Sequence, residues 1–169
     1  RRGGMAALTA RSLAAELGSS AKPVFGLFEN MQEVQDEVVR AANAEYQSFL
    51  RAEMMRGAYP PYKASGMAYI AFARQEKELF KLLFMRDRTE EDSETEDESI
   101  DGIIALISRN TGLSNEDARL FHLEMWIFVH GIATMIVTGY LDWEEEYVSR
   151  TLTDVYEGLK ARWCGGNGK

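Results

Sequence analysis

Residues 8–34 read LTARSLAAELGSSAKPVFGLFENMQEV, and this stretch predicts two short helices, a tight turn between them and the start of a third helix. Thr9 is a favourable N-cap for a first helix that carries apolar residues at Leu13 and Leu17. Gly18 follows directly and can take the left-handed conformation that ends a helix. The opening of the chain is therefore predicted to be a compact helical unit.

Start signals also precede the second and third helices. Ser20 can cap the second helix, with Pro23 in its first turn, where a missing N–H costs little. Asn30 can cap the third helix, and Glu33 follows three residues later, as in a capping box. Two helices joined by a short Gly-containing turn are typical of a helix-turn-helix, whose second helix enters the major groove of DNA. An ordinary helical hairpin is the alternative.

The same stretch carries a family resemblance. Its pattern is Leu-Thr-x-x-x-Leu-Ala-x-x-Leu-Gly-x-Ser, four residues, an aromatic residue and then Phe. This pattern resembles the tetracycline-repressor (TetR) family of one-component transcriptional regulators, most strongly from about Ala7 to Val34. The resemblance implies an all-α fold. A helix-turn-helix DNA-binding domain, residues 1–40, would precede a helical ligand-binding and dimerisation domain, residues 41–169.

The resemblance also implies where DNA is contacted. The helix starting near Ser20 corresponds to the recognition helix, and the expected DNA-binding residues are Thr9, Arg11, Ser20, Lys22, Pro23, Phe25 and Met31. Phe25 stands where the family usually has Tyr, so a hydroxyl donor is missing. Met31 stands where the family usually has Lys, so a positive charge is missing. Both departures weaken the expected affinity, because phosphate contacts supply most of it.

In the family a further helix precedes this motif, and residues 1–4, Arg-Arg-Gly-Gly, resemble the end of that helix and its loop. We therefore expect roughly 20 to 30 further residues upstream in the natural protein, because two isolated helices cannot bury a core.

Charge is distributed unevenly along the chain. The formal net charge is −8, but residues 87–99 hold eight acidic side chains against Arg88 alone. We interpret this segment as a solvated, mobile loop, with an acidic interaction segment as the alternative. Residues 1–40 contain five basic and five acidic side chains, so the acidity does not lie in the DNA-facing unit.

Cysteine and catalytic motifs are scarce. Cys164 is the only cysteine, has no metal-ligand spacing around it and suits a reducing cytoplasm. The sequence contains no Ser-His-Asp order and no Gly-rich phosphate loop. These observations predict a cytoplasmic protein that is not an enzyme and that uses neither a metal nor another cofactor.

A long helix is predicted from Gln32 to about Met55, and in the TetR-like interpretation it links the DNA-facing unit to the rest of the chain. A break at residues 57–61 and helical spacing up to Met85 follow. Further helices are predicted over residues 100–111, from a cap at Ser114 to about Tyr140, and after a cap formed by Asp142 and Glu145.

The helix after Ser114 is apolar on almost every side, which raises the possibility of a membrane span. His122, Glu124 and His130 lie inside it, and both flanks are acidic, which disfavours a span. A helix that is apolar all round is otherwise buried on both sides.

At about 100° per residue the helix divides into two faces. One face should point into the subunit, where the resemblance implies a mostly apolar ligand pocket. Its predicted lining is Phe72, Phe80, Phe84, Ile107, His122, Met125, Trp126, Val129 and His130. Ordinary core packing is the alternative for each, and satisfied buried histidines are the favoured alternative for His122 and His130.

On the opposite face the side chains around Gly131 are small, which suits a close contact between two helices across a two-fold axis. The resemblance implies a four-helix dimer interface formed by the last two helices of each subunit, about Leu120 to Tyr140 and Val148 to Trp163. The predicted interface residues are Ile127, Gly131, Met135, Thr138, Val148, Leu152, Val155 and Leu159.

The function predicted from these features is a ligand-responsive, homodimeric transcriptional regulator, most simply a repressor. Its partners would be double-stranded operator DNA and a small apolar effector. The alternative is a dimeric ligand-binding or protein-interaction module with a degenerate helix-turn-helix.

Overall fold

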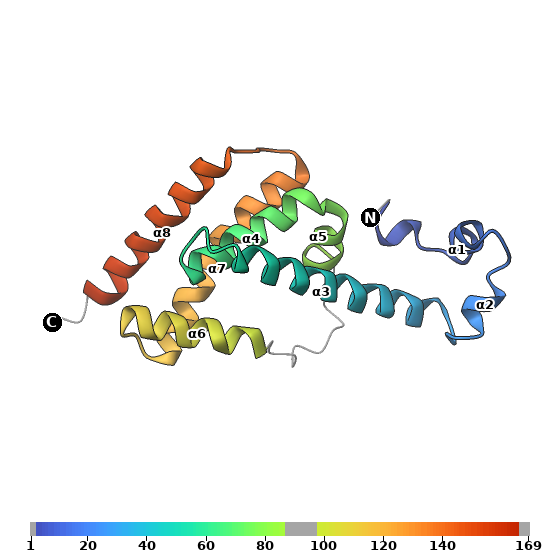
Figure 1. The fold of residues 1–169 in the computed structure, drawn as a ribbon, viewed down its shortest axis with the longest axis horizontal. Helices are drawn as coiled ribbons and strands as arrows, with labels where there is room; N and C mark the ends of the chain where they lie inside the picture. The colour runs from blue at the N-terminus through green and yellow to red at the C-terminus, as the bar shows by residue number, and fades with distance from the viewer. Residues whose placement is uncertain (1–2, 87–97, 166–169) are drawn as a thin grey trace.

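In the computed structural model, which describes residues 3–86 and 98–165, all the regular structure is helical, as predicted (Figure 1). The elements in chain order are η1 (Met5–Ala7), α1 (Ala10–Leu17), α2 (Lys22–Phe25), α3 (Met31–Met55), α4 (Pro61–Gln75), α5 (Lys77–Phe84), α6 (Glu98–Thr111), α7 (Asn115–Thr138) and α8 (Glu145–Gly165). Most of the segment predicted as an acidic loop, residues 87–97, lies outside the described residues.

Helices α1 and α2 lie at the far end of α3, away from the other helices (Figure 1). The Thr9 hydroxyl accepts a bond from the Ser12 N–H at 3.1 Å, and the Ser12 hydroxyl accepts one from the Thr9 N–H at 2.9 Å. Gly18 ends α1 at φ 62°, as predicted. Neither α1 nor α2 contains a buried residue. Local caps therefore define this unit.

The start of α2 differs from the prediction. The N-cap is Ala21, without a side-chain cap, so the expectation of a Ser20 cap was wrong. Ser20 lies two residues before the first helical residue, too early for a side-chain cap. Pro23 does lie in the first turn, as predicted.

The start of α3 is capped from both directions. Asn30 Oδ1 accepts a bond from the Glu33 N–H at 3.0 Å, as predicted. The Glu33 carboxylate in turn accepts a bond from the Glu29 N–H at 2.6 Å, one residue before the cap. These two hydrogen bonds thus fix the backbone at the junction between α2 and α3.

The core lies where α3, α5 and α7 pack against α4. Phe72 of α4 is fully buried, with its ring centroid 5.1 Å from that of Tyr46 and 5.4 Å from that of Phe49, both on α3. The helix predicted to continue from Gln75 to Met85 is interrupted at Glu76, whose φ of −122° and ψ of 54° are not helical. This bend lets α5 place Phe80 in the same core.

Helix α7 is long and apolar enough to cross a membrane by length and composition, with a mean hydropathy of 1.6 in its most apolar window. Its middle is tied to α8, because the Glu124 carboxylate accepts bonds from Arg162 at 3.2 Å and from the Trp163 indole at 2.9 Å. One face is buried in the chain, whereas Leu120 and Ile127 on the other are exposed. The apolar residues of α7 thus serve in part to pack it against other helices of the chain. A single helix of this length and composition is weak evidence for a membrane span.

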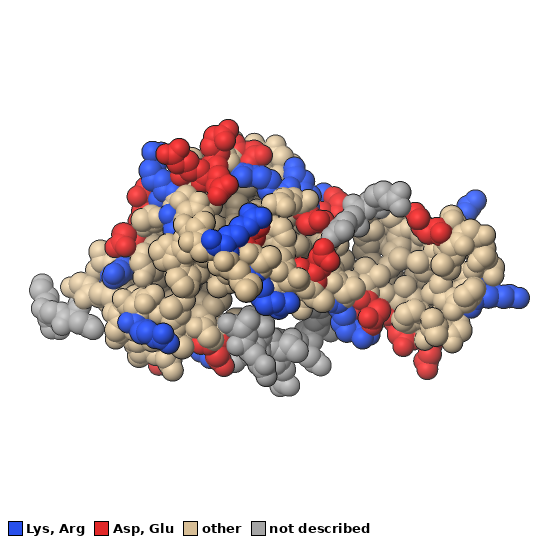
Figure 2. All heavy atoms as spheres, viewed as in Figure 1, with Lys and Arg blue, Asp and Glu red and all other residues tan. Residues whose placement is uncertain are grey.

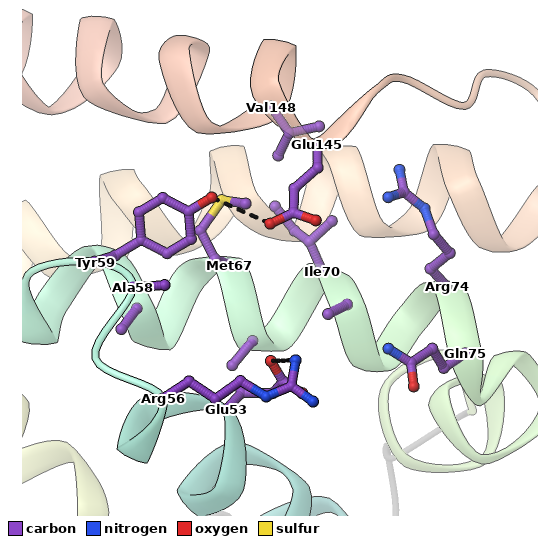
Figure 3. A pocket seen from close by; sticks show the side chains of 13 residues that line it. Glu53, Arg56, Ala58, Tyr59, Met67, Ile70, Arg74, Gln75, Glu145 and Val148 are labelled. Atoms are coloured by element: carbon purple, nitrogen blue, oxygen red, sulfur yellow. Dashed lines mark hydrogen bonds and ion pairs between the residues drawn. The ribbon is translucent and has the colours of Figure 1, made fainter.

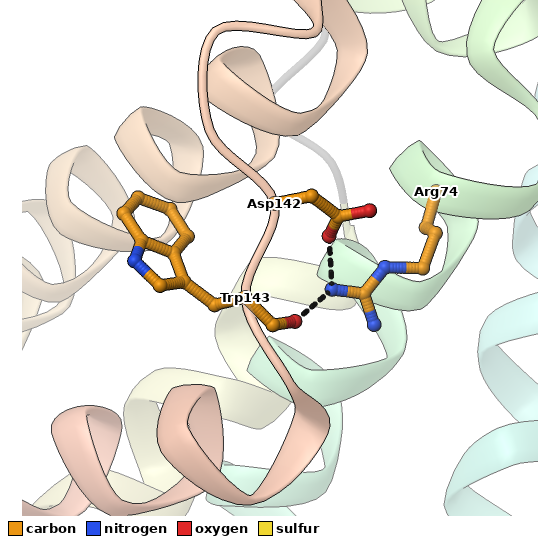
Figure 4. Close-up of polar contacts among 3 residues, drawn as sticks. All are labelled: Arg74, Asp142 and Trp143. Carbon is orange, nitrogen blue, oxygen red and sulfur yellow. Dashed lines mark hydrogen bonds and ion pairs between the residues drawn. The ribbon is translucent and has the colours of Figure 1, made fainter.

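Helix α8 is held against the rest of the chain by polar contacts at its start. The Arg74 guanidinium, near the end of α4, donates to Asp142 Oδ1 at 2.7 Å and to the Trp143 carbonyl at 2.6 Å (Figure 4). Further along, the Lys63 ammonium donates to the Thr153 hydroxyl at 2.8 Å. The start of α4 is thus bonded to α8, and the end of α4 to the connection that precedes α8.

Candidate functional site

A cavity of about 900 Å³ lies among α3, α4, α7 and α8, with the end of α5 and part of α6 completing its wall. Six aromatic side chains line it: Tyr46, Tyr62, Tyr69, Phe84, Trp126 and Tyr156. Aliphatic residues such as Leu50, Ile103 and Leu152 fill much of the remaining wall. A volume of this order, with an apolar wall and a few polar groups, is typical of small-molecule sites.

Five of the nine residues predicted to line a ligand pocket do line this cavity: Phe84, His122, Met125, Trp126 and Val129. The side chains of Phe72, Phe80 and Ile107 are instead enclosed in the core and do not reach the cavity. Helical spacing identified them as inward-facing, but it could not separate the core from the cavity wall. Ligand contact by the five lining residues stays a prediction.

His130 lies one layer behind the cavity wall. Its ring stacks on that of Trp126, with centroids 4.8 Å apart and an interplanar angle of 16°. Its Nδ1 is 2.8 Å from the Tyr69 hydroxyl. His130 therefore supports two cavity-lining side chains without lining the cavity itself.

His122 forms an equivalent pair, with Nδ1 3.0 Å from the Tyr62 hydroxyl. Burial lowers the pKa of both histidines and raises the pKa of Tyr62. The imidazoles are therefore neutral at pH 7, and each Nδ1 can accept the bond that its tyrosine donates. Both are satisfied histidines, and the part of the wall that His122 forms is polar but uncharged.

Sequence reasoning missed the polar side chains of the cavity. Asn43 and Gln47 of α3, Lys63 of α4 and Arg86 after α5 line it. Polar residues on amphipathic helices usually face water, so the positions of these four residues in the sequence did not indicate that they line a cavity. One available signal was the spacing of Tyr62 and Tyr69 on α4, which places both on one helix face.

A second, much smaller pocket of about 150 Å³ lies beside the turn between α3 and α4 (Figure 3). The Tyr59 hydroxyl crosses it to donate to Glu145 Oε1 at 3.1 Å, and Arg56 pairs with Glu53 at 3.1 Å. The space suits a few water molecules. The hydrogen bond from Tyr59 therefore ties the start of α8 to the turn between α3 and α4.

The predicted DNA-binding residues lie on α1, α2 and the helix starts. Thr9, Arg11, Ser20, Lys22 and Pro23 are exposed, Phe25 is 40% exposed, and Met31 is half-buried as the first residue of α3. At this end of the molecule Figure 2 shows basic and acidic side chains side by side, without a continuous basic patch on the face in view. The surface therefore matches the balanced charge of residues 1–40.

Four predicted dimer residues lie on the outer face of α7. Ile127 is 59% exposed, Met135 and Thr138 are exposed, and Gly131 is half-buried. A Cβ built at Gly131 would meet no atom within 4 Å, so the space beside it is open in the single chain. This face remains available for a second copy.

The prediction for α8 needs correction. Val148 and Leu152 are only 1% and 2% exposed, so both are buried in their own chain and cannot form a dimer surface. Val155 and Leu159 are half-buried and also pack against the core. The apolar stripe on α8 was identified correctly, but periodicity cannot tell whether a stripe faces its own subunit or another.

A family model described as "Tetracyclin repressor-like, C-terminal domain" matches residues 62–156, which is more than half of the chain. The fold places two short helices, α1 and α2, ahead of an all-helical part of the chain that holds a cavity. The chain belongs to the tetracycline repressor-like family of regulators. No curated protein and no solved structure shows significant similarity to the chain.

Proposed function

We propose that the protein is a ligand-responsive transcriptional regulator that binds double-stranded operator DNA and an effector in the 900 Å³ cavity. One observation carries this proposal. Helix α3 begins directly after the helix-turn-helix and then lines the cavity with Val39, Asn43, Tyr46 and Leu50 on one face. A single rigid element therefore meets both proposed binding sites.

The proposed response follows from this shared helix. A ligand that binds more tightly to one position of α3 than to another shifts the population toward that position. Because α1 and α2 are attached to the start of α3, the separation of two recognition helices in a dimer would change. We propose that operator affinity falls when the effector binds, and that the protein acts in the cytoplasm as a repressor.

A homodimer is part of this proposal, because two half-sites on DNA require two recognition helices about 34 Å apart. The supporting surface is the outer face of α7, where Leu120, Leu123 and Ile127 are exposed and Gly131 permits close approach. Contiguous exposed apolar residues mark interaction sites. A two-fold axis beside α7 would cover this face with its own copy.

The test is binding of the full natural chain to DNA from upstream of its own gene, measured by fluorescence anisotropy at about 50 to 200 mM salt. The proposal predicts binding that weakens steeply with salt, because each neutralised phosphate contributes a slope of about −0.9 in log–log form. A scrambled DNA of equal length is the control. Absent or salt-independent binding contradicts the regulator proposal.

A second candidate is a dimeric ligand-binding module that no longer reads DNA. It is favoured by the four-residue length of α2, together with Phe25 and Met31 at positions where donors are expected. The same experiment separates the two, because this candidate predicts dimerisation and ligand binding without salt-dependent DNA binding.

A further inference from the structure

We infer that the cavity takes an amphipathic anion, an apolar and largely aromatic body with one carboxylate or sulfonate, whose charged group binds the Lys63 ammonium. This inference rests on the proposed function, because it assumes that the cavity holds the effector. It adds the chemical class of the effector.

The charges that line the cavity favour an anion. Among the described residues they are Arg40, Lys63, Arg86 and Glu157, so cations outnumber carboxylates. Arg40 is paired with Glu37 at 2.6 Å, and Arg86 already interacts with other groups. A cavity whose walls carry one predominant sign of charge attracts ligands of the opposite sign.

Among the described residues, Lys63 has no negatively charged partner. Its ammonium donates to the Thr153 hydroxyl at 2.8 Å and lies 5.1 Å from the centroid of the Tyr59 ring, and both partners are neutral. No carboxylate of the described residues lies within ion-pair distance of it. An ammonium has three donors, so two remain for a ligand oxygen. Bonds from an ammonium to a carboxylate are about twice as strong as bonds between neutral groups.

The part of the wall that α7 forms offers uncharged contacts to an apolar body. Met125, Trp126 and Val129 line it from α7, and the nearby His122 is neutral and already bonded to Tyr62. The indole of Trp126 supplies a flat surface on which an aromatic ring can pack. The ligand charge is therefore recognised at the α4–α8 side and the apolar part at the α7 side.

A lipophilic cation fits this distribution less well. The cavity-lining carboxylate in the described part of the chain is Glu157, an exposed residue one turn after Thr153 on α8. A cation placed there would share the cavity with three positive side chains, a like-charge arrangement that lowers affinity.

Two fluorescent probes with the same aromatic body test the inference on the full chain. The first is 8-anilinonaphthalene-1-sulfonate, and the second is N-phenyl-1-naphthylamine, which lacks the sulfonate. We expect the anionic probe to bind about tenfold more tightly, as for a hydrogen bond to a charged group. Lys63→Gln should weaken binding of the anionic probe about tenfold and leave the neutral probe unchanged.

Two further variants serve as controls. Lys77→Gln removes the same charge from an exposed position on α5 that does not line the cavity, and it should change neither affinity. Lys63→Arg keeps the positive charge and should retain the preference for the anionic probe. Circular dichroism checks that each variant is folded.

The outcomes distinguish failure of the anion inference from failure of the proposed ligand cavity. Equal affinities for the two probes in the natural protein, or a preference that survives Lys63→Gln, overturn the anion inference and leave the ligand cavity standing. Failure of both probes to bind the folded chain overturns the inference together with the proposed ligand cavity.

Discussion

Phe72 lies fully buried in the aromatic core, with no exposed surface and with ring contacts to Tyr46 and Phe49. Phe72→Ala should lower the free energy of unfolding by about 3–5 kcal/mol, because it removes buried contacts and leaves a cavity. Urea denaturation measures the change. Phe25→Ala, at a side chain 40% exposed, should change it by less than about 1 kcal/mol. Similar losses for both variants contradict the assigned core.

His122 and His130 should make stability depend on pH. Burial lowers their folded-state pKa below the ordinary value of 6.5, which the unfolded chain keeps. As the pH falls through 6.5 the unfolded state takes up protons that the folded state resists, so stability is lost toward acid pH.

The measurement is the urea midpoint at about pH 7.5 and about pH 5.5, with 6.5 between them. The natural protein should lose more stability on acidification than the double variant His122→Gln, His130→Gln, whose side chains do not titrate. An equal loss in both proteins contradicts the assignment.

At the scale of elements, glycines mark where helices end. Gly139 terminates α7 at φ 71°, whereas Gly158 lies inside α8, and a Cβ at either position meets no atom within 4 Å. Gly139→Ala should destabilise by about 1 kcal/mol through backbone strain. Gly158→Ala should stabilise by about 0.5–1 kcal/mol through helix propensity. Thermal unfolding of the two variants gives the signs, and stabilisation by both changes contradicts the left-handed cap.

The element boundaries were predictable wherever a short-range signal decides them. The caps at Thr9, Asn30 and Ser114 depend on a side chain and a backbone N–H three residues apart, which the sequence displays directly. The bend at Glu76 has neither Gly nor Pro at it, so no local signal predicted it. The polar wall of the cavity could not be predicted from local signals either, since two of its residues, Lys63 and Thr153, are 90 residues apart along the chain.

At the scale of the whole molecule, the outer face of α7 should hold two copies together. Ile127→Glu would bury an unpaired carboxylate near the proposed axis, so the dimer dissociation constant should rise about a hundredfold or more. Sedimentation equilibrium measures it. Met55→Glu introduces the same group at an 87% exposed side chain at the end of α3 and should leave the dimer intact. An intact Ile127→Glu dimer contradicts the proposed interface.

The most direct test of the central claim, that α3 couples the cavity to the DNA-facing unit, is operator affinity with and without saturating 8-anilinonaphthalene-1-sulfonate. We predict that filling the cavity lowers operator affinity by about fivefold or more, and that operator DNA weakens probe binding by the same factor. An operator affinity that stays the same with the cavity filled contradicts coupling through α3.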